Sequence, residues 1–487
     1  MSFRWRLALA GAGGLAAALG QVPWSLWPLA LFGLALIVWL IDRAETPRRA
    51  ALIAFVAGGA QFALAMSWII EPFLIEPEVY GWMAPFALIL MAAGGGVFWA
   101  LPVWGALRWR RSIGAIVLAL TLSDLARGYI LTGFPWALIG HIWIETPVAQ
   151  VASLVGQTGL TLLTLAVCGG AIAALARPIF LGLVILGLVG PWVFGAWRLA
   201  QPEPAATGLT LRLVQPNAAQ TDKWDPDLAR QHFNTLLAET GAGPKVDLII
   251  WPETSLPYLI ENDPQIPLMI AQAANDTPVL FGLQRVDGAR GWNSLRVQDG
   301  AGNLLASYDK HHLVPFGEYI PFGDLAYDWF GLRAFAAQTG HAYSAGSGPA
   351  VLDLGPLGKV LPLICYEAVF PQDLRTDLRP DWIVQITNDA WFGLRSGPFQ
   401  HAALAQLRAI EQGLALARSA NTGVTEMIDA RGRVVASLPF GQQGHLDAQL
   451  PVALPPTPYA RWSEIPVLVL LGGLALGLMR RRAVRAA

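Results

Sequence analysis

The sequence predicts a multi-span α-helical membrane domain joined to an α/β domain outside the membrane. Of its 487 residues, 54% are hydrophobic and only 14% are charged, whereas soluble domains contain about 25% charged residues. Long apolar segments follow one another through residues 1–197 and return near the C-terminus. Between them, residues 198–463 alternate strand-like and helix-like segments, which is typical of α/β architecture.

Length and composition predict where the membrane is crossed, because a spanning helix needs roughly 20 mostly apolar residues. We expect eight spans, at residues 7–22, 24–41, 51–70, 84–106, 112–127, 150–175, 179–197 and 464–479. The first, second and fifth are short and have the alternative of interfacial or re-entrant helices. We interpret the first as a retained span rather than a signal peptide, because it runs directly into another apolar segment.

Arginine distribution predicts the orientation, because positively charged loops stay in the cytoplasm. Arginines gather before the first span and after the second, fourth, sixth and last: Arg4, Arg6, Arg43, Arg48, Arg49, Arg108, Arg110, Arg111, Arg177, Arg480, Arg481, Arg482 and Arg485. Arg127 and Arg198 are exceptions. Eight spans place both termini in the cytoplasm, with residues 480–487 as a basic tail. Residues 198–463 then lie on the opposite face, which in a bacterium is the periplasmic side of the inner membrane.

The segment 198–463 fits a single α/β sandwich. Strand-like runs occur at residues 209–215, 246–251, 278–283, 294–298, 304–308, 359–365, 382–387 and 424–428. Helix-like stretches at 226–240, 264–275 and 398–413 each have a proline at or just before their first turn, where proline is favoured. The net charge of -1 leaves no broad basic surface, so we expect no nucleic-acid partner. The two cysteines exclude a disulfide framework, because Cys168 lies within an apolar span.

Reactive side chains stand where three of the expected strands end. Glu253 follows a buried strand after Pro252, Lys310 begins a loop that also carries Glu318, and Cys365 ends an apolar run. Each residue has a plain alternative. Cys365 could be a small buried hydrophobe, Glu253 a helix N-terminal charge, Lys310 a solvated lysine, and Glu318 a surface partner of an arginine.

Together these motifs resemble a known family. Trp251-Pro-Glu253, Lys310 with the following Pro315-Phe-Gly-Glu318, and Ile364-Cys-Tyr-Glu367 are similar, in the same order, to the Glu, Lys and Cys triad of the nitrilase superfamily. The membrane-embedded branch, the apolipoprotein N-acyltransferases, resembles the chain from end to end, with further matching stretches at residues 132–136, 223–225 and 387–393. Asp124 departs from the pattern, because a glutamate is expected before the Arg-Gly pair.

The resemblance implies a nitrilase-like α-β-β-α sandwich and a role for each residue of the site. Cys365 would be the nucleophile, Glu253 the general base and Lys310 the cation that stabilises the oxyanion, since a thiol near pKa 8.5 must lose its proton to attack. Glu318 would orient this cluster. Supporting roles would fall to Trp224, Tyr366 and Glu367, of which the last two keep the alternatives of strand-end packing and a salt-bridge partner.

The resemblance also implies the substrates. A phospholipid, typically phosphatidylethanolamine, would acylate Cys365, and the thioester would pass its acyl chain to the N-terminal amine of the diacylglyceryl-cysteine of an apolipoprotein in a ping-pong reaction. Aromatic residues suited to membrane lipid lie in residues 319–343 and at 391–392: Phe322, Tyr327, Trp329, Phe330, Phe335, Trp391 and Phe392. Their alternative is packing against the domain's own core. We expect a monomer.

No cofactor or metal ion is expected. The sequence lacks a glycine-rich phosphate loop, and His311 and His312 are neighbours whose side chains should point apart, without ligand spacing around them. We expect Arg408 and Glu411 to pair on a helix surface. Two other functions are open: a membrane-anchored amidase or nitrilase that hydrolyses a C–N bond, and a transporter or receptor with a vestigial outer domain. Eight spans disfavour the first, and the intact triad disfavours the second.

Overall fold

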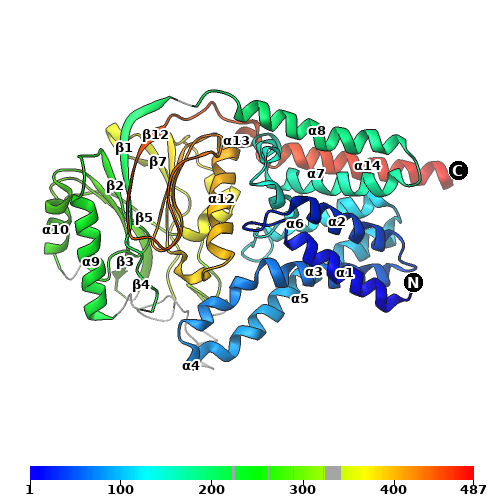
Figure 1. The fold of residues 1–487 in the computed structure, drawn as a ribbon, viewed down its shortest axis with the longest axis horizontal. Coiled ribbons are helices and arrows are strands. Elements are labelled where there is room, and N and C mark those ends of the chain that lie inside the picture. Colours follow the sequence, from blue (N-terminus) through cyan, green and yellow to red (C-terminus); the bar gives the residue numbers. More distant parts are fainter. Residues whose placement is uncertain are drawn as a thin grey trace.

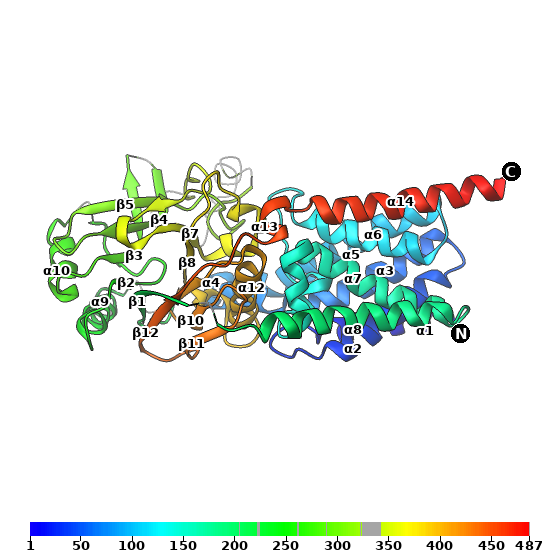
Figure 2. The same ribbon diagram turned by 90° about the horizontal axis from the view of Figure 1, so that it is seen from above.

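A helical domain and an α/β domain lie end to end in the computed structural model (Figures 1 and 2). The structure describes residues 1–486 except 204, 222–224, 261–262, 289, 322 and 324–341. Both chain termini lie at the end of the helical domain that is farther from the α/β domain. The predictions for Trp224 and for the aromatic residues of the loop fall outside the described residues: Phe322, Tyr327, Trp329, Phe330 and Phe335.

The helical domain is built from the N-terminal helices and the last helix. They are α1 (Phe3–Ala18), α2 (Trp27–Asp42), α3 (Pro47–Ala65), α4 (Pro77–Tyr80), α5 (Ala84–Trp109), α6 (Ile113–Arg127), α7 (Ala152–Ala174), α8 (Ile179–Leu199) and α14 (Ile465–Ala486), with short 3₁₀ segments η1 (Ser67–Leu74), η2 (Gly81–Met83), η3 (Ile139–Trp143) and η4 (Pro147–Val151). A helix overlaps each of the eight expected spans.

Helix length and composition support a membrane domain. Within the described chain, three helical stretches are long and apolar enough to cross a bilayer: Pro77–Trp109, Pro147–Ala174 and Ile179–Leu199. A fourth is added if the bent pair Pro47–Ala65 and Ser67–Leu74 forms one span, and Trp27–Asp42 and Ile465–Met479 are shorter apolar helices. The count of eight spans stays a prediction.

Two six-stranded mixed sheets form the centre of the α/β domain. The first has the order β12-β1-β2-β3-β4-β5 and the second β11-β10-β9-β8-β7-β6. The strands are β1 (Ala206–Gln215), β2 (Leu248–Ile250), β3 (Val279–Asp287), β4 (Arg290–Gln298), β5 (Leu304–Asp309), β6 (Leu352–Asp353), β7 (Lys359–Ile364), β8 (Trp382–Thr387), β9 (Leu416–Ala420), β10 (Thr425–Ile428), β11 (Val434–Leu438) and β12 (Gly444–Pro451). In each sheet the three central strands are parallel, β1-β2-β3 and β7-β8-β9.

Alternating side chains stack the domain into four layers, because successive strand residues face opposite sides of a sheet. Leu248 and Ile250 of β2 face the second sheet, while Ile249 packs under α9 (Pro226–Gly241) and α10 (Gln265–Ala274). On the second sheet, Leu361 and Leu363 pack against α12 (Gly397–Gln412). The predicted α-β-β-α sandwich is therefore confirmed.

Helix α12 separates the second sheet from the helical domain (Figure 1). Its Leu404, Leu407 and Ile410 belong to the hydrophobic cluster of the helical domain. The expectation that Arg408 and Glu411 pair on a helix surface is wrong: they form an ion pair of 3.2 Å, and both are fully buried. The pairing itself follows the helical spacing, but burial on both faces of α12 removes it from solvent.

Candidate active site

The ends of three strands bring Glu253, Lys310 and Cys365 together in one buried site. Glu253 follows β2 and Lys310 follows β5 in the first sheet, while Cys365 follows β7 in the second. The exposed fraction is 5% for Glu253, 1% for Lys310 and 5% for Cys365. Nζ of Lys310 lies 3.7 Å from Oε1 of Glu253, and the charges of both groups act on the Cys365 thiol. Lys310 is therefore not the solvated lysine of the plain alternative.

Glu318 holds the ammonium of Lys310. Nζ of Lys310 lies 3.0 Å from Oε1 and 2.9 Å from Oε2 of Glu318, and Glu318 also accepts from the backbone N–H of Val314 at 2.8 Å. Burial alone would lower the pKa of Lys310, but the carboxylates of Glu318 and Glu253 raise it above its usual value. Lys310 therefore remains an ammonium at neutral pH, and Glu318 is a buried partner of this lysine rather than of an arginine.

Glu253 is oriented by both of its oxygens. Oε1 accepts from Nδ2 of Asn293 at 2.7 Å, and Oε2 accepts from the backbone N–H of Asn388 at 2.8 Å. Nδ2 of Asn293 also donates to Glu318 at 2.9 Å, so one amide spans the two carboxylates. Gly282 of β3 makes room for this arrangement, because a Cβ at this position would come within 2.6 Å of Cα of Glu253.

Cys365 occupies a strained turn. Its φ of 52° lies in the left-handed region, which is rare for residues other than glycine and gathers at functional sites. The carbonyl of Cys365 lies 3.2 Å from Nε2 of Gln385 and 3.1 Å from Nε2 of His401, and these contacts hold the turn. Nδ1 of His401 in turn lies 2.9 Å from Asp389.

The environment of the Cys365 thiol disfavours its ionised form. Burial raises its pKa well above the usual value and the charge of Glu253 raises it further, whereas Lys310 and a hydrogen bond with Thr387 act in the opposite direction. The resting group is therefore a thiol, which needs a base beside it to become a nucleophile.

Glu367 and Tyr366 follow Cys365 and contact the loop after Lys310 and the helical domain, respectively. Oε1 of Glu367 accepts from the hydroxyl of Tyr308 at 2.8 Å and from the backbone N–H of His311 at 2.9 Å, while Oε2 accepts from the N–H of Ile364 at 2.7 Å. This carboxylate ties the loop after Lys310 to the turn at Cys365. The hydroxyl of Tyr366 donates to the carbonyl of Gly133 in the helical domain at 3.3 Å.

The prediction that the neighbouring side chains of His311 and His312 point apart is wrong, because both approach Asp373. Nδ1 of His312 lies 2.8 Å and Nε2 of His311 3.4 Å from the carboxylate of Asp373, and ligand atoms of the three residues lie within 4.8 Å of one another. Burial lowers the pKa of His311, but Asp373 and Glu367 raise it to about 9. As an imidazolium at neutral pH, His311 pairs with the carboxylates of Glu367 and Asp373.

The helical domain covers the Cys365 side of the site with aromatic rings. The ring centroid of Trp136 lies 5.5 Å from that of His401, 5.7 Å from that of Phe392 and 4.7 Å from that of Trp68. Oε1 of Gln400 accepts from both indoles, at 3.2 Å from Trp68 and 2.8 Å from Trp136. The stretches 132–136 and 387–393, both noted above for their family resemblance, therefore contact each other. The sequence did not predict this contact, because the two stretches lie far apart in the chain.

Asn293, Gln385, Gln400 and His401 were missed by sequence reasoning. Each lies inside a strand or helix rather than at a strand end, so the signal that identified Glu253, Lys310 and Cys365 does not extend to them. Asn388 lies within the stretch 387–393 that resembles the family, but no role was predicted for this residue. The local signal for the others is a polar side chain at an inward-facing position, which by itself does not indicate what it contacts.

Two family models match the chain. The apolipoprotein N-acyltransferase N-terminal domain matches residues 13–170, and the carbon-nitrogen hydrolase model matches residues 210–454. Among curated relatives, the apolipoprotein N-acyltransferase of Bradyrhizobium diazoefficiens is 35% identical, covering 100% of this chain and 97% of the relative. That of Caulobacter vibrioides is 37% identical, covering 95% of this chain and 92% of the relative.

Solved structures with similar folds align with about half of the chain. An amidase from Nesterenkonia with acetamide bound covalently at its active-site cysteine has 18% identity and a TM-score of 0.38, covering 52% of this chain and 94% of its own. A CN-hydrolase superfamily protein from Xanthomonas campestris has 21% identity and a TM-score of 0.36, covering 50% and 90%.

Proposed function

The chain belongs to the apolipoprotein N-acyltransferase family, and from this premise we propose that Cys365 carries an acyl chain as a thioester between two substrates. As a member of this family it is an acyltransferase of a bacterial membrane that N-acylates lipoproteins, with a lipid as donor. The donor in this proposal is a phospholipid, typically phosphatidylethanolamine. The acceptor is the N-terminal amine of the diacylglyceryl-cysteine in an apolipoprotein.

One observation carries the proposal: the turn that bears Cys365 packs directly on the helical domain. Tyr366, Val369 and Phe370, just after the cysteine, belong to the same hydrophobic cluster as buried residues of α1, α2, α3, α5, α6 and α7. An enzyme that takes both substrates from a bilayer needs its nucleophile close to the membrane. A hydrolase acting on a soluble amide has no such requirement.

The first half of the reaction is acylation of Cys365. Glu253 removes the thiol proton, and the thiolate attacks the carbonyl carbon of the sn-1 ester. The tetrahedral intermediate collapses with cleavage of the ester C–O bond. Glu253 returns its proton to the departing oxygen, so a lysophospholipid leaves and the thioester remains on the enzyme.

Lys310 and the backbone N–H after Cys365 stabilise the oxyanion of the intermediate. A donor of this kind contributes roughly 3 to 4 kcal/mol in enzymes from which one has been removed. Support comes from the 1% exposed fraction of Lys310 and from its two contacts to Glu318, which fix the ammonium before substrate binds. Glu318 is in this proposal an orienting group, and Glu367 and Tyr366 hold the turn. Trp224 is proposed as a residue of the active-site loop.

The second half transfers the acyl chain to the acceptor. The amine attacks the thioester carbon, Glu253 accepts a proton from the nitrogen, and cleavage of the C–S bond releases the amide. The proton returns to the sulfur of Cys365, so the enzyme ends as it began. The overall reaction converts a phospholipid and an amine into a lysophospholipid and an N-acylated, triacylated lipoprotein.

The proposed orientation places the site outside the cytoplasm. Residues 1–197 and 464–479 form the membrane part with eight spans, residues 198–463 the periplasmic catalytic domain and residues 480–487 the cytoplasmic tail. The position of both termini at the end of the helical domain far from the α/β domain supports an even number of spans (Figure 1).

Intact mass spectrometry tests the thioester. Purified protein incubated with phosphatidylethanolamine should gain one acyl group, released by neutral hydroxylamine, and Cys365→Ala should gain none. Absence of the adduct from the wild type, or its persistence in Cys365→Ala, overturns the proposal.

The acceptor is tested separately. A diacylated lipopeptide with a free amine should discharge the adduct much faster than buffer does, while the same peptide with an acetylated amine should not. If water discharges the thioester as fast as the free amine, the carbon-nitrogen hydrolase alternative, an amidase or nitrilase, is the better description.

A further inference from the structure

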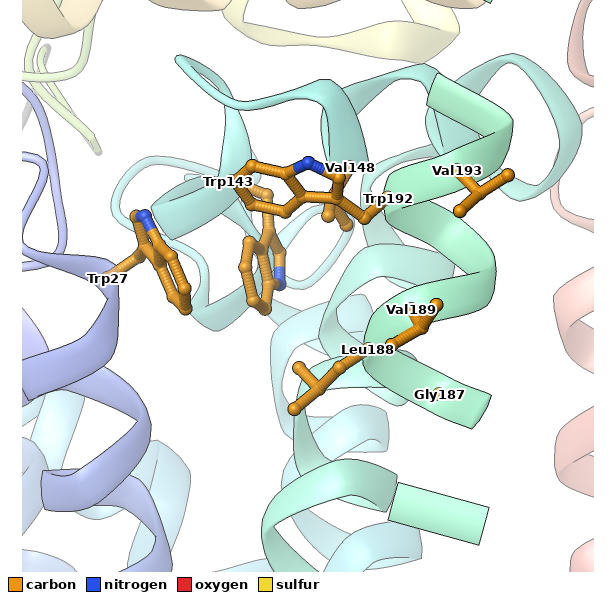
Figure 3. A pocket seen from close by; sticks show the side chains of 8 residues that line it. All are labelled: Trp27, Trp143, Val148, Gly187, Leu188, Val189, Trp192 and Val193. Carbon is orange, nitrogen blue, oxygen red and sulfur yellow. The ribbon is translucent and has the colours of Figure 1, made fainter. Parts of the chain in front are cut away.

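An apolar cavity of about 250 Å³ opens on the side of the helical domain, between α2 and α8 (Figure 3). Three indoles, those of Trp27, Trp143 and Trp192, face it, and its other lining residues are aliphatic or glycine. The ring centroid of Trp27 lies 5.5 Å from that of Trp143 and 5.6 Å from that of Trp192. We refer to this cavity as the indole groove. Its composition suits a hydrocarbon chain and offers no charged partner to a polar ligand.

The indole groove is separate from the candidate active site. Its lining comes from α2, η3, η4 and α8, and none of its lining residues contacts Glu253, Lys310 or Cys365 among the interactions of the described chain. The groove lies in the half of the helical domain nearer the α/β domain, because the last lining residue, Val193, is on the part of α8 that leads into β1 (Figure 1).

A cluster of arginines stands at the end of α8, just beyond the groove. Arg198 donates to the side chain of Gln150, whose Nε2 donates to the backbone carbonyl of Arg431 at 2.9 Å. Arg433 donates to carbonyls at the end of α8 and just after it, at 3.4 to 3.5 Å. Arg198, Arg431 and Arg433 therefore gather at one junction, which we call the arginine junction.

The arginine junction carries excess positive charge. Among the described residues, Asp429 is the one carboxylate in ion-pair contact with it, and that contact goes to Arg433 at 2.6 Å. The guanidinium of Arg431 instead donates to the carbonyl of Pro202 at 2.8 Å. Burial and the charge of Arg433 lower the pKa of Arg431, as expected where like charges crowd together. An anion at this junction would relieve that repulsion.

Groove and junction are spaced like the two ends of a phospholipid. Five residues separate Val193 from Arg198, a rise of about 7.5 Å along a helix. The polar layer of one bilayer leaflet is about 5 to 7 Å thick, from the difference between the full membrane and its hydrocarbon core. Arg198 and the backbone carbonyl of Arg431 both contact Gln150, which lies two residues after the groove residue Val148. A lipid whose chain lies in the groove would therefore have its phosphate near these arginines. Tryptophan near such an interface is also favoured.

We infer that the indole groove and the arginine junction together bind one molecule of anionic phospholipid, at a site distinct from the one that acylates Cys365. The acyl chain lies in the cavity against the indoles of Trp27, Trp143 and Trp192, and the phosphate pairs with Arg198 and Arg431. A zwitterionic lipid binds less well, because its ammonium meets the same positive charge. Arg198 is one of the two exceptions to the clustering of arginines on the cytoplasmic side, and binding of the lipid phosphate gives this residue a function. The inference goes beyond the proposed function and does not depend on it.

Native mass spectrometry of the Cys365→Ala protein in detergent tests the inference, because this variant binds lipid without being acylated. Phosphatidylglycerol and phosphatidylethanolamine with identical acyl chains are titrated in parallel. At the site that Val189→Trp abolishes, we expect one tightly held phosphatidylglycerol and at least tenfold weaker binding of phosphatidylethanolamine. Lipid bound in the active site is recognised because Val189→Trp leaves it in place. Arg198→Gln combined with Arg431→Gln should weaken phosphatidylglycerol binding about 25-fold, since each interfacial arginine contributes about a factor of five, and should remove the headgroup preference.

Matched variants separate the groove from general effects. Val189→Trp fills the groove and should weaken both lipids, whereas Leu183→Trp adds the same bulk on a more distant, exposed face of α8 and should leave both unchanged. Arg230→Gln removes one charge far from the junction and should change nothing, and Arg198→Lys with Arg431→Lys should retain the preference. Each variant is first checked for an unchanged unfolding temperature.

Four results overturn the inference: no preference for phosphatidylglycerol in the Cys365→Ala protein, a preference that survives removal of both arginines, undiminished binding to Val189→Trp, or effective competition by inorganic phosphate. Inorganic phosphate should fail to compete at millimolar concentration, and effective competition would show a plain anion site in place of a lipid site. A failed acyl-transfer assay with normal lipid binding would count against the proposed function alone.

Discussion

Two of the buried charge clusters in the described part of the chain differ in what surrounds them. The first, which we call the catalytic cluster after its proposed role, joins Lys310 to Glu253 and Glu318. The second, the junction cluster, is separate from the arginine junction and joins Arg408 to Glu411 between α12 and α7. The exposed fraction is 5% or less for every one of these side chains. Burial and ion pairing are therefore the same in both, so neither property can by itself identify a catalytic site.

Hydrogen bonding separates the two clusters. In the catalytic cluster, Lys310 contacts both oxygens of Glu318, and Glu253 is held through each of its oxygens. In the junction cluster, among the described residues, Nε and Nη1 of Arg408 and Oε2 of Glu411 lack hydrogen-bond partners. Arg408 and Glu411 contact Gln157 of α7 rather than a nucleophile. The first cluster is held by hydrogen bonds beside the proposed nucleophile, whereas the second joins α12 to α7 of the helical domain.

The largest expected effect comes from breaking the junction cluster. Arg408→Ala leaves the carboxylate of Glu411 buried without its cation, which typically costs about 3 to 5 kcal/mol. We expect a strongly lowered unfolding temperature and rapid proteolysis near α12. Arg408→Met combined with Glu411→Leu removes both charges and should recover most of the stability. An unchanged unfolding temperature in Arg408→Ala would show that the ion pair does not lock the domains.

The next effect comes from the catalytic cluster. Lys310→Ala should slow formation of the Cys365 thioester about 100- to 1000-fold, because an oxyanion donor is lost, while the protein still folds. The rate of adduct formation by intact mass measures the first effect, and the unfolding temperature measures the second. Lys245→Ala, at an exposed position, is the matched control. A normal adduct rate in Lys310→Ala would remove the lysine from the chemistry.

The contrast explains what could be predicted from the sequence. Glu253, Lys310 and Cys365 were recognisable because each ends a strand-like run and belongs to a short motif. The neighbours that fix their geometry were not recognisable: Asn293 lies inside β4, and His401 lies inside α12. A polar residue within a regular element has no local signal for its partner, because that partner comes from another part of the chain.

The same limit applies to the fold. All eight strand-like runs and all three helix-like stretches of the α/β domain correspond to elements of the structure. The strands β6, β9, β11 and β12 were not predicted. β12 contains the polar residues His445, Asp447 and Gln449, which weaken its strand pattern. It lies at the end of the domain in sequence, yet it pairs with β1 from the start and forms the edge of the first sheet. Tertiary pairing of this kind overrides a weak local pattern.

Glu411 gives a pH dependence to the junction cluster. Burial raises the pKa of Glu411 to about 7, although Arg408 acts to lower it. A carboxyl group with a raised pKa in the folded state binds more protons there than in the unfolded state, so stability falls as pH rises from about 4.5 to 7 and then levels. We expect a higher unfolding temperature at pH 5 than at pH 8, apart from other titrating groups.

Two variants assign this effect. Glu411→Gln should reduce the slope of the curve between pH 5 and 7, and combining it with Glu426→Gln should reduce the slope further. Glu426, which burial also gives a pKa of about 7, provides the matched comparison through Glu426→Gln. If the slope is unchanged in Glu411→Gln but lost in Glu426→Gln, the titration belongs to the second sheet and not to the contact with α7.

The smallest expected effect concerns Tyr366 and tests whether this residue belongs to the catalytic cluster. Tyr366 is adjacent to Cys365 in sequence, but its hydroxyl donates to Gly133 at 3.3 Å, and its ring lies 4.8 Å from that of Phe370 between centroids. Tyr366→Phe loses one long hydrogen bond, worth about 1 kcal/mol or less, and should change the acyl-transfer rate less than fivefold. Tyr366→Leu, which also loses the ring contacts, should lower the unfolding temperature more. A 100-fold slower reaction in Tyr366→Phe would instead place this hydroxyl in the catalytic cluster, because packing alone cannot explain such a loss from a single oxygen atom.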